Sequence, residues 1–367
     1  MAQIEIRDVS KSFRSGKVLN AVGLSADQGE IVVIFGPSGS GKTVLLRLIA
    51  GVESVDSGVI ALQGRDVTDA APETRGVGMA FQNFALFPHM SAYDNVAAPL
   101  MARNASAAEI KAKVESVAKL LKITHVLQHA PRELSNGQKQ RTALARALAG
   151  DPRILLLDDP LRNVDAKLRY EMRLELPSLL KTSGSTVLYV TQDYKEAMAL
   201  GDRIAVLLDG AFAQIASPAE VYLEPATTGV ARLFGDPTIN LLPATPSLRG
   251  GEPVFSLGGA AMTLPERLAH IAGISCMIGL RPESVTVEDA PAPTSFPVEV
   301  VAATPLNEKL VLLLRTSDGL EILAAEAGSE EVSRRHGPAF ARFDRDAALV
   351  FDAASGRRIA PRTARSA

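Results

Sequence analysis

Tryptophan is absent from this chain, cysteine occurs once, and neither sign of charge prevails among its 367 residues. A single cysteine can build neither an intrachain disulfide nor a zinc site, which favours a reducing compartment. Cys276 stands among apolar residues, so we expect it to be a buried small hydrophobe. With 39 basic against 41 acidic residues and no strongly basic half, the composition gives no reason to expect a nucleic-acid partner.

Long hydrophobic runs are missing as well. No apolar stretch approaches the ~18 residues that a membrane-spanning helix needs. The first segment, Met1–Phe13, mixes charged and apolar residues with a period of two, which is typical of a strand and unlike the apolar centre of a signal peptide. We therefore expect that the protein could act at a membrane only by docking onto other subunits.

The length of the chain predicts two domains. Short apolar runs rich in β-branched residues recur through the first two thirds and predict the buried strands of an α/β sheet. We expect residues 83–150 to form a mostly helical insertion into this core, in which Ser106 and Glu109 form a capping box before one helix. The predicted strands are Ile31–Phe35, Ile154–Leu157, Val187–Val190 and Ile204–Leu208.

The character of the chain changes after Gly235. Proline and glycine recur in this part of the chain. Between them lie short segments in which apolar and polar residues alternate, and these segments predict a small β-barrel or sandwich. We therefore assign residues 1–235 to the α/β domain and residues 236–359 to the β domain. Residues 360–367 are expected to be a disordered tail, because they lack apolar side chains that could anchor them.

The clearest chemical motif is a glycine-rich loop between a predicted strand and a predicted helix. It fits the pattern G-x-x-x-x-G-K-[ST] of phosphate-binding loops. Glycines allow successive backbone N–H groups to point at one anion, and the N-terminus of the following helix adds partial positive charge there. A glycine-rich turn without a ligand is the alternative. The loop residues are Gly36, Pro37, Ser38, Gly39, Ser40, Gly41, Lys42 and Thr43.

Two side chains of this loop and one carboxylate are expected to contact a nucleotide and its metal. Lys42 would reach the β- and γ-phosphates of ATP, and the hydroxyl of Thr43 would bind Mg²⁺. A buried strand that ends in a carboxylate would place Asp158 at the same edge of the sheet, where it can hold Mg²⁺, usually through water. Apolar strands often end in Asp at a turn for structural reasons, so this assignment depends on the loop.

The segment Leu134-Ser135-Asn136-Gly137-Gln138 resembles the signature motif of ABC transporter ATPases. Ser135 would cap a helix, with Gln138 closing a capping box, and the helix would direct its N-terminus at a phosphate. On its own, the segment would be a well-capped helix with no further role. The resemblance to this family extends from residue 4 to about residue 240.

The resemblance implies an α/β fold, the P-loop ABC ATPase domain with its helical insertion, followed by a small all-β, OB-like (TOBE) regulatory domain. Within the family, the chain is most similar to the ATPases of maltose, glycerol-phosphate and polyol importers, through residues 76–89. The segment Gly279–Glu283 resembles part of their regulatory domain. The family binds ATP in a head-to-tail dimer, which would place the nucleotide between the phosphate loop of one subunit and Ser135, Gly137 and Gln138 of the other.

The resemblance also implies roles for single residues. Phe13 resembles the aromatic residue that stacks on adenine, although without the resemblance it would be expected in the core. Gln82 resembles the glutamine that senses Mg²⁺ and the γ-phosphate and couples to membrane subunits. The residues implied in catalysis are Asp159, Gln192 and Gln82, and those implied in metal binding are Thr43, Gln82 and Asp158.

The sequence departs from the family pattern at positions that carry the chemistry. Asp159 replaces a glutamate and is one methylene shorter, which withdraws the carboxylate by more than ~1 Å, and a misplacement of about 1 Å can cost on the order of a hundredfold in rate. Gln192 replaces a histidine, and an amide can donate a hydrogen bond but cannot carry charge. Asn136 replaces a glycine of the signature, and Arg162 replaces a small serine beside Asn163–Asp165, which resembles the dimer-interface loop.

These departures predict a chain that binds ATP well and hydrolyses it slowly in its own site. Such a chain would pair with a second, different ATPase that supplies a competent site. A homodimer with modest activity is the alternative.

The sequence therefore predicts the energy-coupling subunit of an importer for a sugar, polyol or glycerol-phosphate solute, peripheral to the cytoplasmic face of the membrane. Its expected cofactors are ATP and Mg²⁺. Its expected partners are a second ATPase subunit, identical or different, two integral membrane permease subunits and, indirectly, an extracytoplasmic solute-binding protein. The apolar strip Phe84–Phe87 would contact the permeases, unless it belongs to the core. The alternative function is a soluble, non-transport ABC ATPase with a regulatory role.

Overall fold

The computed structural model describes residues 2–162, 164–306, 309–327 and 336–362. Contacts divide the chain into two compact units, Met1–Glu220 and Val221–Ala367. The division falls earlier than residue 235, because the segment before that residue packs within the second unit. For example, the guanidinium of Arg281 donates to the carbonyl oxygen of Phe234 at 2.7 Å. The assignment of domains along the chain stays a prediction.

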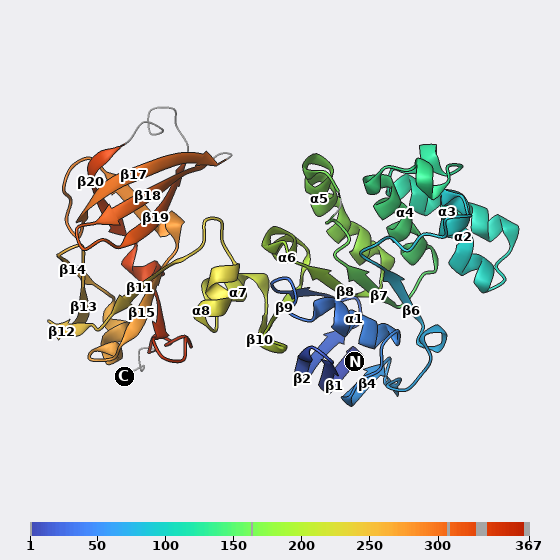
Figure 1. Ribbon diagram of the computed structural model, residues 1–367, viewed down its shortest axis with the longest axis horizontal. Coiled ribbons are helices and arrows are strands. Elements are labelled where there is room, and N and C mark those ends of the chain that lie inside the picture. Colours follow the sequence, from blue (N-terminus) through green and yellow to red (C-terminus); the bar gives the residue numbers. More distant parts are fainter. Residues whose placement is uncertain (1, 163, 307–308, 328–335, 363–367) are drawn as a thin grey trace. The chain divides into compact units, whose positions relative to one another are not determined.

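A mostly parallel sheet is the foundation of the first unit (Figure 1). Its strands are β3 (Ile31–Phe35), β6 (Val77–Ala80), β7 (Ile154–Asp158), β8 (Thr186–Thr191), β9 (Arg203–Leu208) and β10 (Ala211–Ala216). Their spatial order is β10-β9-β3-β8-β7-β6, in which only β10 pairs antiparallel with its neighbour. Every residue of β3, β7 and β8 is buried, as expected for strands covered on both faces. The strands expected from short apolar runs are confirmed.

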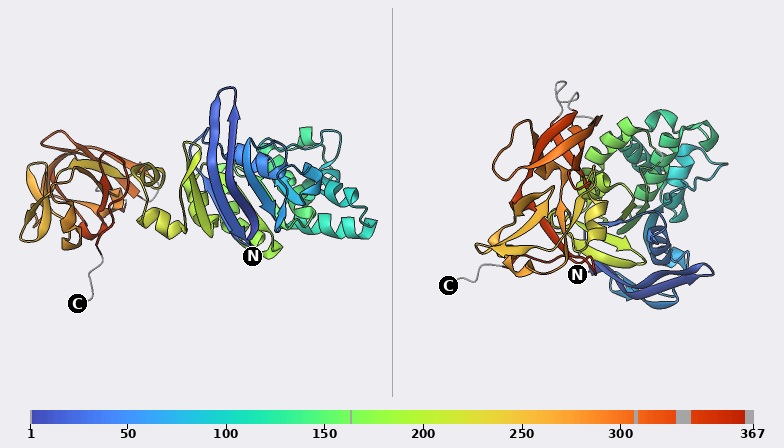
Figure 2. Two further views of the ribbon diagram at one scale, coloured as in Figure 1. Left: turned by 90° about the horizontal axis from the view of Figure 1, so that it is seen from below. Right: turned by 60° about the vertical axis from the view of Figure 1, so that its left-hand side comes forward.

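An antiparallel sheet completes the core of this unit. It contains β1 (Ala2–Phe13), β2 (Gly16–Asp27), β4 (Ser57–Leu62) and β5 (Arg65–Asp66), in the order β2-β1-β4-β5. The left view of Figure 2 shows β1 and β2 as a long hairpin, which confirms the strand expected at the N-terminus. One cluster of buried side chains joins this sheet to the larger one through helix α1 (Lys42–Ala50), and it includes Ile6, Ile34 and Leu45.

The expected helical insertion is confirmed as α2 (Ala92–Ala102), α3 (Ala107–Leu120) and α4 (Asn136–Ala149). Ser106 caps α3 by accepting the backbone N–H of Glu109 at 3.3 Å. The carboxylate of Glu109 pairs instead with Arg103 at 2.6 Å, so the second half of the predicted capping box is wrong. A charge-assisted bond to a guanidinium is stronger than a bond to a backbone N–H, which accounts for the difference. The other helices of this unit are α5 (Ala166–Ser183) and α6 (Tyr194–Leu200).

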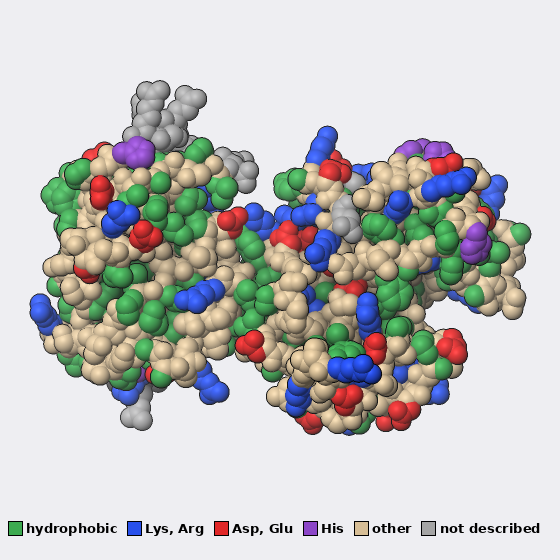
Figure 3. Space-filling model, viewed as in Figure 1, with side chains coloured by type: hydrophobic (Ala, Val, Ile, Leu, Met, Phe, Trp, Pro, Cys, Tyr) green, Lys and Arg blue, Asp and Glu red, His purple; other side chains and the backbone are tan. Residues whose placement is uncertain are grey.

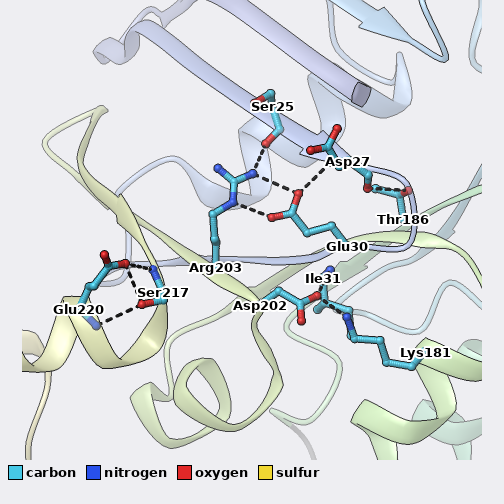
Figure 4. A network of polar contacts seen from close by, with 10 residues as sticks. All are labelled: Ser25, Asp27, Glu30, Ile31, Lys181, Thr186, Asp202, Arg203, Ser217 and Glu220. Atoms are coloured by element: carbon cyan, nitrogen blue, oxygen red, sulfur yellow. Dashed lines mark hydrogen bonds and ion pairs between the residues drawn. The ribbon is translucent and has the colours of Figure 1, made fainter. Parts of the chain in front are cut away.

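Polar contacts fix the beginning of β3, the strand that carries the glycine-rich loop (Figure 4). Arg203, which begins β9, donates from Nε to Oε1 of Glu30 at 2.6 Å and also reaches the carbonyl oxygen of Ser25 at 2.6 Å. Asp202 accepts the backbone N–H of Ile31 at 2.8 Å. These bonds join β2, β3 and β9 at the beginning of the strand that leads into the loop.

The second unit begins with the end of α7 (Pro218–Leu223) and with α8 (Thr228–Leu233). From residue 240 onward it is a small β structure, as expected from the frequent turns after residue 235. Its sheets have the orders β11-β15-β21, β12-β13-β14 and β16-β20-β17-β18-β19. These strands are β11 (Asn240–Ala244), β12 (Ser247–Arg249), β13 (Glu252–Leu257), β14 (Ala260–Thr263), β15 (Cys276–Leu280), β16 (Val285–Glu288), β17 (Phe296–Leu306), β18 (Lys309–Thr316), β19 (Glu321–Ala327), β20 (Gly337–Phe343) and β21 (Leu349–Asp352).

Arg281, in the segment Gly279–Glu283, has a structural place in this unit. It is buried, and its guanidinium carbon lies 3.6 Å from the ring centroid of Tyr222. The same guanidinium donates to the carbonyl oxygens of Phe234 and Tyr222. A buried cation with an aromatic ring and two carbonyl oxygens around it has the partners that it needs. Arg281 therefore ties the segment of α7 and α8 to the end of β15.

Cys276 begins β15 and is 1% exposed. Burial, assisted by the charge of Asp352, raises the pKa of its thiol to about 11. The thiolate is the reactive form of cysteine, so this residue is an inert part of the core, as its apolar neighbours in sequence suggest.

The end of the chain is described as far as Arg362. Its backbone N–H donates to the carbonyl oxygen of Arg267 at 3.0 Å. The predicted disordered tail falls mainly on residues 363–367, which lie outside the described residues.

Charges of both signs are interspersed on the face of the molecule that Figure 3 shows, among hydrophobic and neutral side chains. Within the part of the chain that the structure describes, no helix has the length and apolar character needed to cross a membrane.

Candidate nucleotide-binding site

The glycine-rich loop joins the end of β3 to the start of α1, and close neighbours determine its shape. Gly41, the N-cap of α1, has a φ of 102°, a left-handed conformation that favours glycine. A Cβ atom at Gly36 would lie 2.3 Å from the carbonyl oxygen of Leu207, so only glycine fits there. No described side chain caps α1, and its first backbone N–H groups are therefore available to an anion.

Lys42 begins α1 and turns its amino group back into the loop. Its Nζ donates to the carbonyl oxygens of Gly36 at 2.8 Å and Pro37 at 2.7 Å, and to the hydroxyl of Ser40 at 3.3 Å. The residue is 5% exposed, and burial lowers the pKa of its amino group. A buried ammonium held by neutral oxygens would exchange them favourably for phosphate oxygens, because bonds between opposite charges are stronger.

Thr43 and Asp158 form a pair of oxygen donors next to this loop. The hydroxyl of Thr43 donates to Oδ1 of Asp158 at 2.9 Å. Asp158 is 2% exposed, and burial raises the pKa of its carboxyl group. Carboxylate and hydroxyl oxygens suit Mg²⁺, which keeps several waters and binds through one or two protein groups. Among the described residues, no cluster of three or more His, Cys, Asp or Glu side chains could bind a metal ion on its own.

A cavity of about 330 Å³ opens where these groups meet. Because β3, β8 and β7 are neighbours in the sheet, their carboxyl ends bring together the phosphate loop, Gln192 and the Asp158–Asp159 pair. Gln82, which follows β6, reaches the same cavity. The lining consists of Phe13, Val18, Ser38, Gly39, Gly41, Lys42, Thr43, Val44, Gln82, Asp158, Asp159, Arg162, Val190 and Gln192.

Asp159 lies in the cavity wall in an unusual backbone conformation. Its φ is 48°, and its backbone N–H donates to the carbonyl oxygen of Val190 at 2.9 Å. Burial raises the pKa of its carboxyl group to about 6, against the opposing charge of Arg162. Nη1 of Arg162 lies 3.7 Å from Oδ2 of Asp159. Sequence reasoning named both residues as departures from the family pattern, but it did not place them in contact.

A buried carboxylate that sequence reasoning missed supports the end of β8. Oε2 of Glu196 accepts the hydroxyls of Tyr189 at 2.9 Å and Thr191 at 2.8 Å. The hydroxyl of Thr191 also accepts the backbone N–H of Asp193 at 3.0 Å, so these bonds hold the residues on either side of Gln192. The only signal in the sequence is an acidic residue one helical turn after Gln192, which is too common a feature to predict this role.

Phe13 ends β1 and is 41% exposed, so it is not a core residue. It lines the same cavity as Val18 and Gly41. Nζ of Lys11 lies 5.3 Å from the centroid of its ring. The ring is thus accessible and braced by a cation, which suits an aromatic surface for stacking.

Ser135 and Gln138 form the predicted capping box at the start of α4. The side chain of Ser135 accepts the backbone N–H of Gln138, and the side chain of Gln138 accepts the backbone N–H of Ser135. Neither these two residues nor Gly137 is part of the lining of the described cavity. The phosphate loop and the signature motif of one chain are therefore separate sites. Asn163, in the predicted interface loop, lies outside the described residues.

The strip Phe84–Phe87 is not core. Phe87 is 42% exposed, and no residue of the strip is buried. A groove of about 1050 Å³ contains Ala85 and Phe87 together with Pro99 of α2 and Arg146 of α4. Arg146 donates to the carbonyl oxygens of Phe84 and Ala85, which fixes the strip beside α4.

The chain is similar in sequence to known proteins. The sequence profile of the ABC transporter family matches residues 19–162. The chain is 41% identical over 359 residues to the sn-glycerol-3-phosphate import ATP-binding protein UgpC of Cereibacter sphaeroides, with 98% of this chain and 100% of that protein aligned. This chain belongs to the ABC transporter family. A protein of the same name from Vibrio cholerae is 42% identical over 305 residues, which cover 83% of this chain and 81% of the relative.

A solved structure supports the same assignment of fold. The ATP-binding cassette MJ0796, in a dimeric post-hydrolysis state bound to ADP and inorganic phosphate, aligns with a TM-score of 0.55 and 31% identity. The alignment covers 59% of this chain and 98% of that one. The chain is thus an ABC ATPase with the mixed α/β fold of the family, followed by a small β domain, and it couples ATP hydrolysis to transport.

Proposed function

We propose that this ABC ATPase binds Mg²⁺-ATP at the end of β3 and drives an importer of a glycerol-phosphate, sugar or polyol solute. The observation that carries the proposal is the meeting of Lys42, Thr43 and Asp158 at one edge of the sheet, with the hydroxyl of Thr43 2.9 Å from the carboxylate of Asp158. The solute class is supported by the relatives from Cereibacter sphaeroides and Vibrio cholerae, whose names describe import of sn-glycerol-3-phosphate.

Each group around the cavity has a role in this proposal. Lys42 and the free N–H groups at the start of α1 bind the β- and γ-phosphates, and Phe13 stacks on adenine. Thr43, Asp158 and Gln82 hold Mg²⁺, which neutralises charge on the phosphate oxygens when it is bound. The remaining loop residues shape the phosphate cradle through their backbone. They are Gly36, Pro37, Ser38, Gly39, Ser40 and Gly41.

Hydrolysis in this site is proposed to be slow. Asp159 polarises the attacking water from a carboxylate that is one methylene shorter than the family's glutamate. Gln192 can donate a hydrogen bond to the γ-phosphate without adding positive charge. We therefore infer a dimer with a second, different ATPase, in which Ser135, Gly137 and Gln138 of this chain complete the partner's nucleotide site.

Contact with the membrane subunits is assigned to the groove beside the strip Phe84–Phe87. The groove has an exposed aromatic side chain, Phe87, and a wall that includes α2 and α4. Gln82, which lines the nucleotide cavity, lies only two residues before this strip, so a change at the γ-phosphate can reach the groove over a short path. In this arrangement the protein is peripheral to the cytoplasmic face of the membrane, with two permease subunits as partners and an external binding protein that delivers the solute.

Steady-state ATP hydrolysis by the purified chain tests the slow site. We expect ATP binding with a turnover well below ~1 per second, at the low end of enzyme rates. A turnover of tens per second would contradict the slow site and the need for a second ATPase.

Purification of the tagged chain from detergent-solubilised membranes tests the transport role. Two integral membrane subunits should be recovered with the wild type and lost with Phe87→Ser. Leu248→Ser, which changes an exposed leucine of the second unit, is the matched control and should retain them. Recovery of the wild-type chain without any membrane subunit would favour a soluble regulatory ATPase.

A further inference from the structure

Arg162 is a cation in the wall of the nucleotide cavity, at a position where similar ATPases have a small serine. It lines the cavity with Lys42, Asp159 and Gln192. Its Nη1 lies 3.7 Å from Oδ2 of Asp159. The side chain of Arg162 is 49% exposed, whereas that of Asp159 is 10% exposed. The carboxylate is therefore held in the wall, and the guanidinium has room to move.

The backbone that carries Arg162 is fixed, which limits this movement to the side chain. The N–H of Arg162 donates to the carbonyl oxygen of Asp159 at 3.3 Å and closes a turn after β7. Arg169 of α5 donates to the carbonyl oxygens of Leu161 at 3.2 Å, Arg162 at 2.9 Å and Val164 at 3.1 Å. The guanidinium of Arg162 therefore has a defined starting position beside Asp159, from which only the side chain moves.

Charges in the cavity are balanced before any nucleotide binds. The described lining of the cavity holds two cations, Lys42 and Arg162, and two carboxylates, Asp158 and Asp159. A terminal phosphate adds negative charge to this set, and Gln192 offers an amide with no positive charge to meet it. A guanidinium can form two parallel bonds to phosphate oxygens, which are stronger than a single ion-pair contact at 3.7 Å.

We propose that Arg162 is the residue by which this site distinguishes ATP from ADP. Its guanidinium leaves Asp159 for the terminal phosphate when ATP is bound and stays with Asp159 when that phosphate is absent. The exchange supplies the positive charge that Gln192 lacks, and it frees the carboxylate of Asp159 toward the attacking water. This role rests on the nucleotide binding proposed above and assigns a function to a residue that departs from the family pattern.

Dissociation constants of the full chain for ADP and for the non-hydrolysable β,γ-imido analogue of ATP, both with Mg²⁺, test this role. Arg162→Gln should lower the preference for the ATP analogue over ADP by about tenfold, because a charge-assisted contact to the terminal phosphate is lost. Arg162→Lys keeps the charge and should retain most of the preference. Arg65→Gln removes a charge from the exposed strand β5 and should leave both constants unchanged.

A double-mutant cycle separates partner exchange from simple attraction. Asp159→Asn removes the carboxylate that competes with the terminal phosphate for Arg162. The substitution should therefore strengthen binding of the ATP analogue more when it is introduced into the wild type than when it is introduced into Arg162→Gln. An unchanged preference in Arg162→Gln, or equal losses for both nucleotides, would overturn the role of Arg162. If the wild type bound neither nucleotide, the proposed function itself would fail, which is a different outcome.

Discussion

The hydroxyl of Thr43 donates a hydrogen bond to Asp158 at 2.9 Å, although 115 positions separate the two residues along the chain. Thr43 lies in the first turn of α1, directly behind the loop that follows β3, and Asp158 ends β7. Only β8 lies between those strands in the sheet. The bond compensates part of the cost of burying the carboxylate, and it places two oxygen ligands suited to Mg²⁺ beside the phosphate loop.

Thr43→Val removes this hydroxyl while keeping the shape of the side chain. ATP affinity in the presence of Mg²⁺ should fall by about tenfold or more, because a bond to a charged partner is lost. Affinity in the presence of a chelator should change little, and nucleotide titrations under both conditions measure the difference. Thr182→Val on α5, where the hydroxyl bonds the carbonyl oxygen of Ser178 at 2.8 Å, is the control and should bind normally. Equal losses with and without Mg²⁺ would show that Thr43 supports the loop and not the metal.

Restoring the family residues should accelerate hydrolysis. Asp159→Glu extends the carboxylate by one methylene, and Gln192→His restores an imidazole at the end of β8. Together they should raise the rate of ATP hydrolysis by ten- to about a hundredfold, the scale set by a misplacement of about 1 Å. The rate is measured as phosphate release by the chain with its partner subunits. An unchanged rate, with ATP binding intact, would place the limitation elsewhere in the site.

The stability of the chain should depend on pH through Glu196. This residue is 2% exposed, and burial raises its pKa above the 4.5 of a solvated glutamate. Its favourable contribution to the free energy of unfolding is therefore complete below pH 4.5, where Glu196 is protonated in both the folded and the unfolded chain. That contribution is lost as the pH rises through the higher pKa that Glu196 has in the folded chain. Glu196→Gln keeps an oxygen for both hydroxyls and does not titrate, so its Tm relative to the wild type should increase from about pH 5 to about pH 8. Thermal unfolding at both pH values measures this difference.

Glu196→Leu is the counterpart of that experiment. It leaves the hydroxyls of Tyr189 and Thr191 without their acceptor, which should cost about 2 kcal/mol or more of unfolding free energy. This loss of unfolding free energy should be present at every pH from about 5 to about 8. A Tm difference between Glu196→Gln and the wild type that stays constant with pH would contradict a titrating carboxyl at this position.

Phe13 provides a test of base stacking. Phe13→Ala should weaken ATP binding by about tenfold, in line with the ~1–3 kcal/mol that stacking of a base on an aromatic side chain contributes. Phe13→Tyr keeps the ring and should bind nearly as the wild type does. Tripolyphosphate with Mg²⁺ carries no base, so its competition for the site should be the same in all three proteins. A loss of tripolyphosphate binding in Phe13→Ala would assign the residue to the shape of the loop.

Local patterns predicted the parts of this protein that depend on short stretches of chain. The glycine-rich loop, the helix that follows it and the capping box of Ser135 and Gln138 were all expected from spacing over a few residues. Such features depend on backbone sterics and on hydrogen bonds between near neighbours. The exception is Glu109, whose carboxylate meets Arg103 and not the backbone N–H of its cap residue, because a competing partner was close by.

The sequence by itself therefore determined the nucleotide loop, the α/β and β parts of the chain and the replaced residues Asp159 and Gln192. Only the tertiary structure decided that Arg162 faces Asp159, that Glu196 supports β8, and that Phe13 is exposed at the cavity. Arg162 and Asp159 are three residues apart, and Glu196 and Thr191 are five residues apart, but their spacing in sequence does not fix where these side chains point. The physical reason is that packing fixes them: the strand order β3-β8-β7 brings segments far apart in the chain to one edge of the sheet.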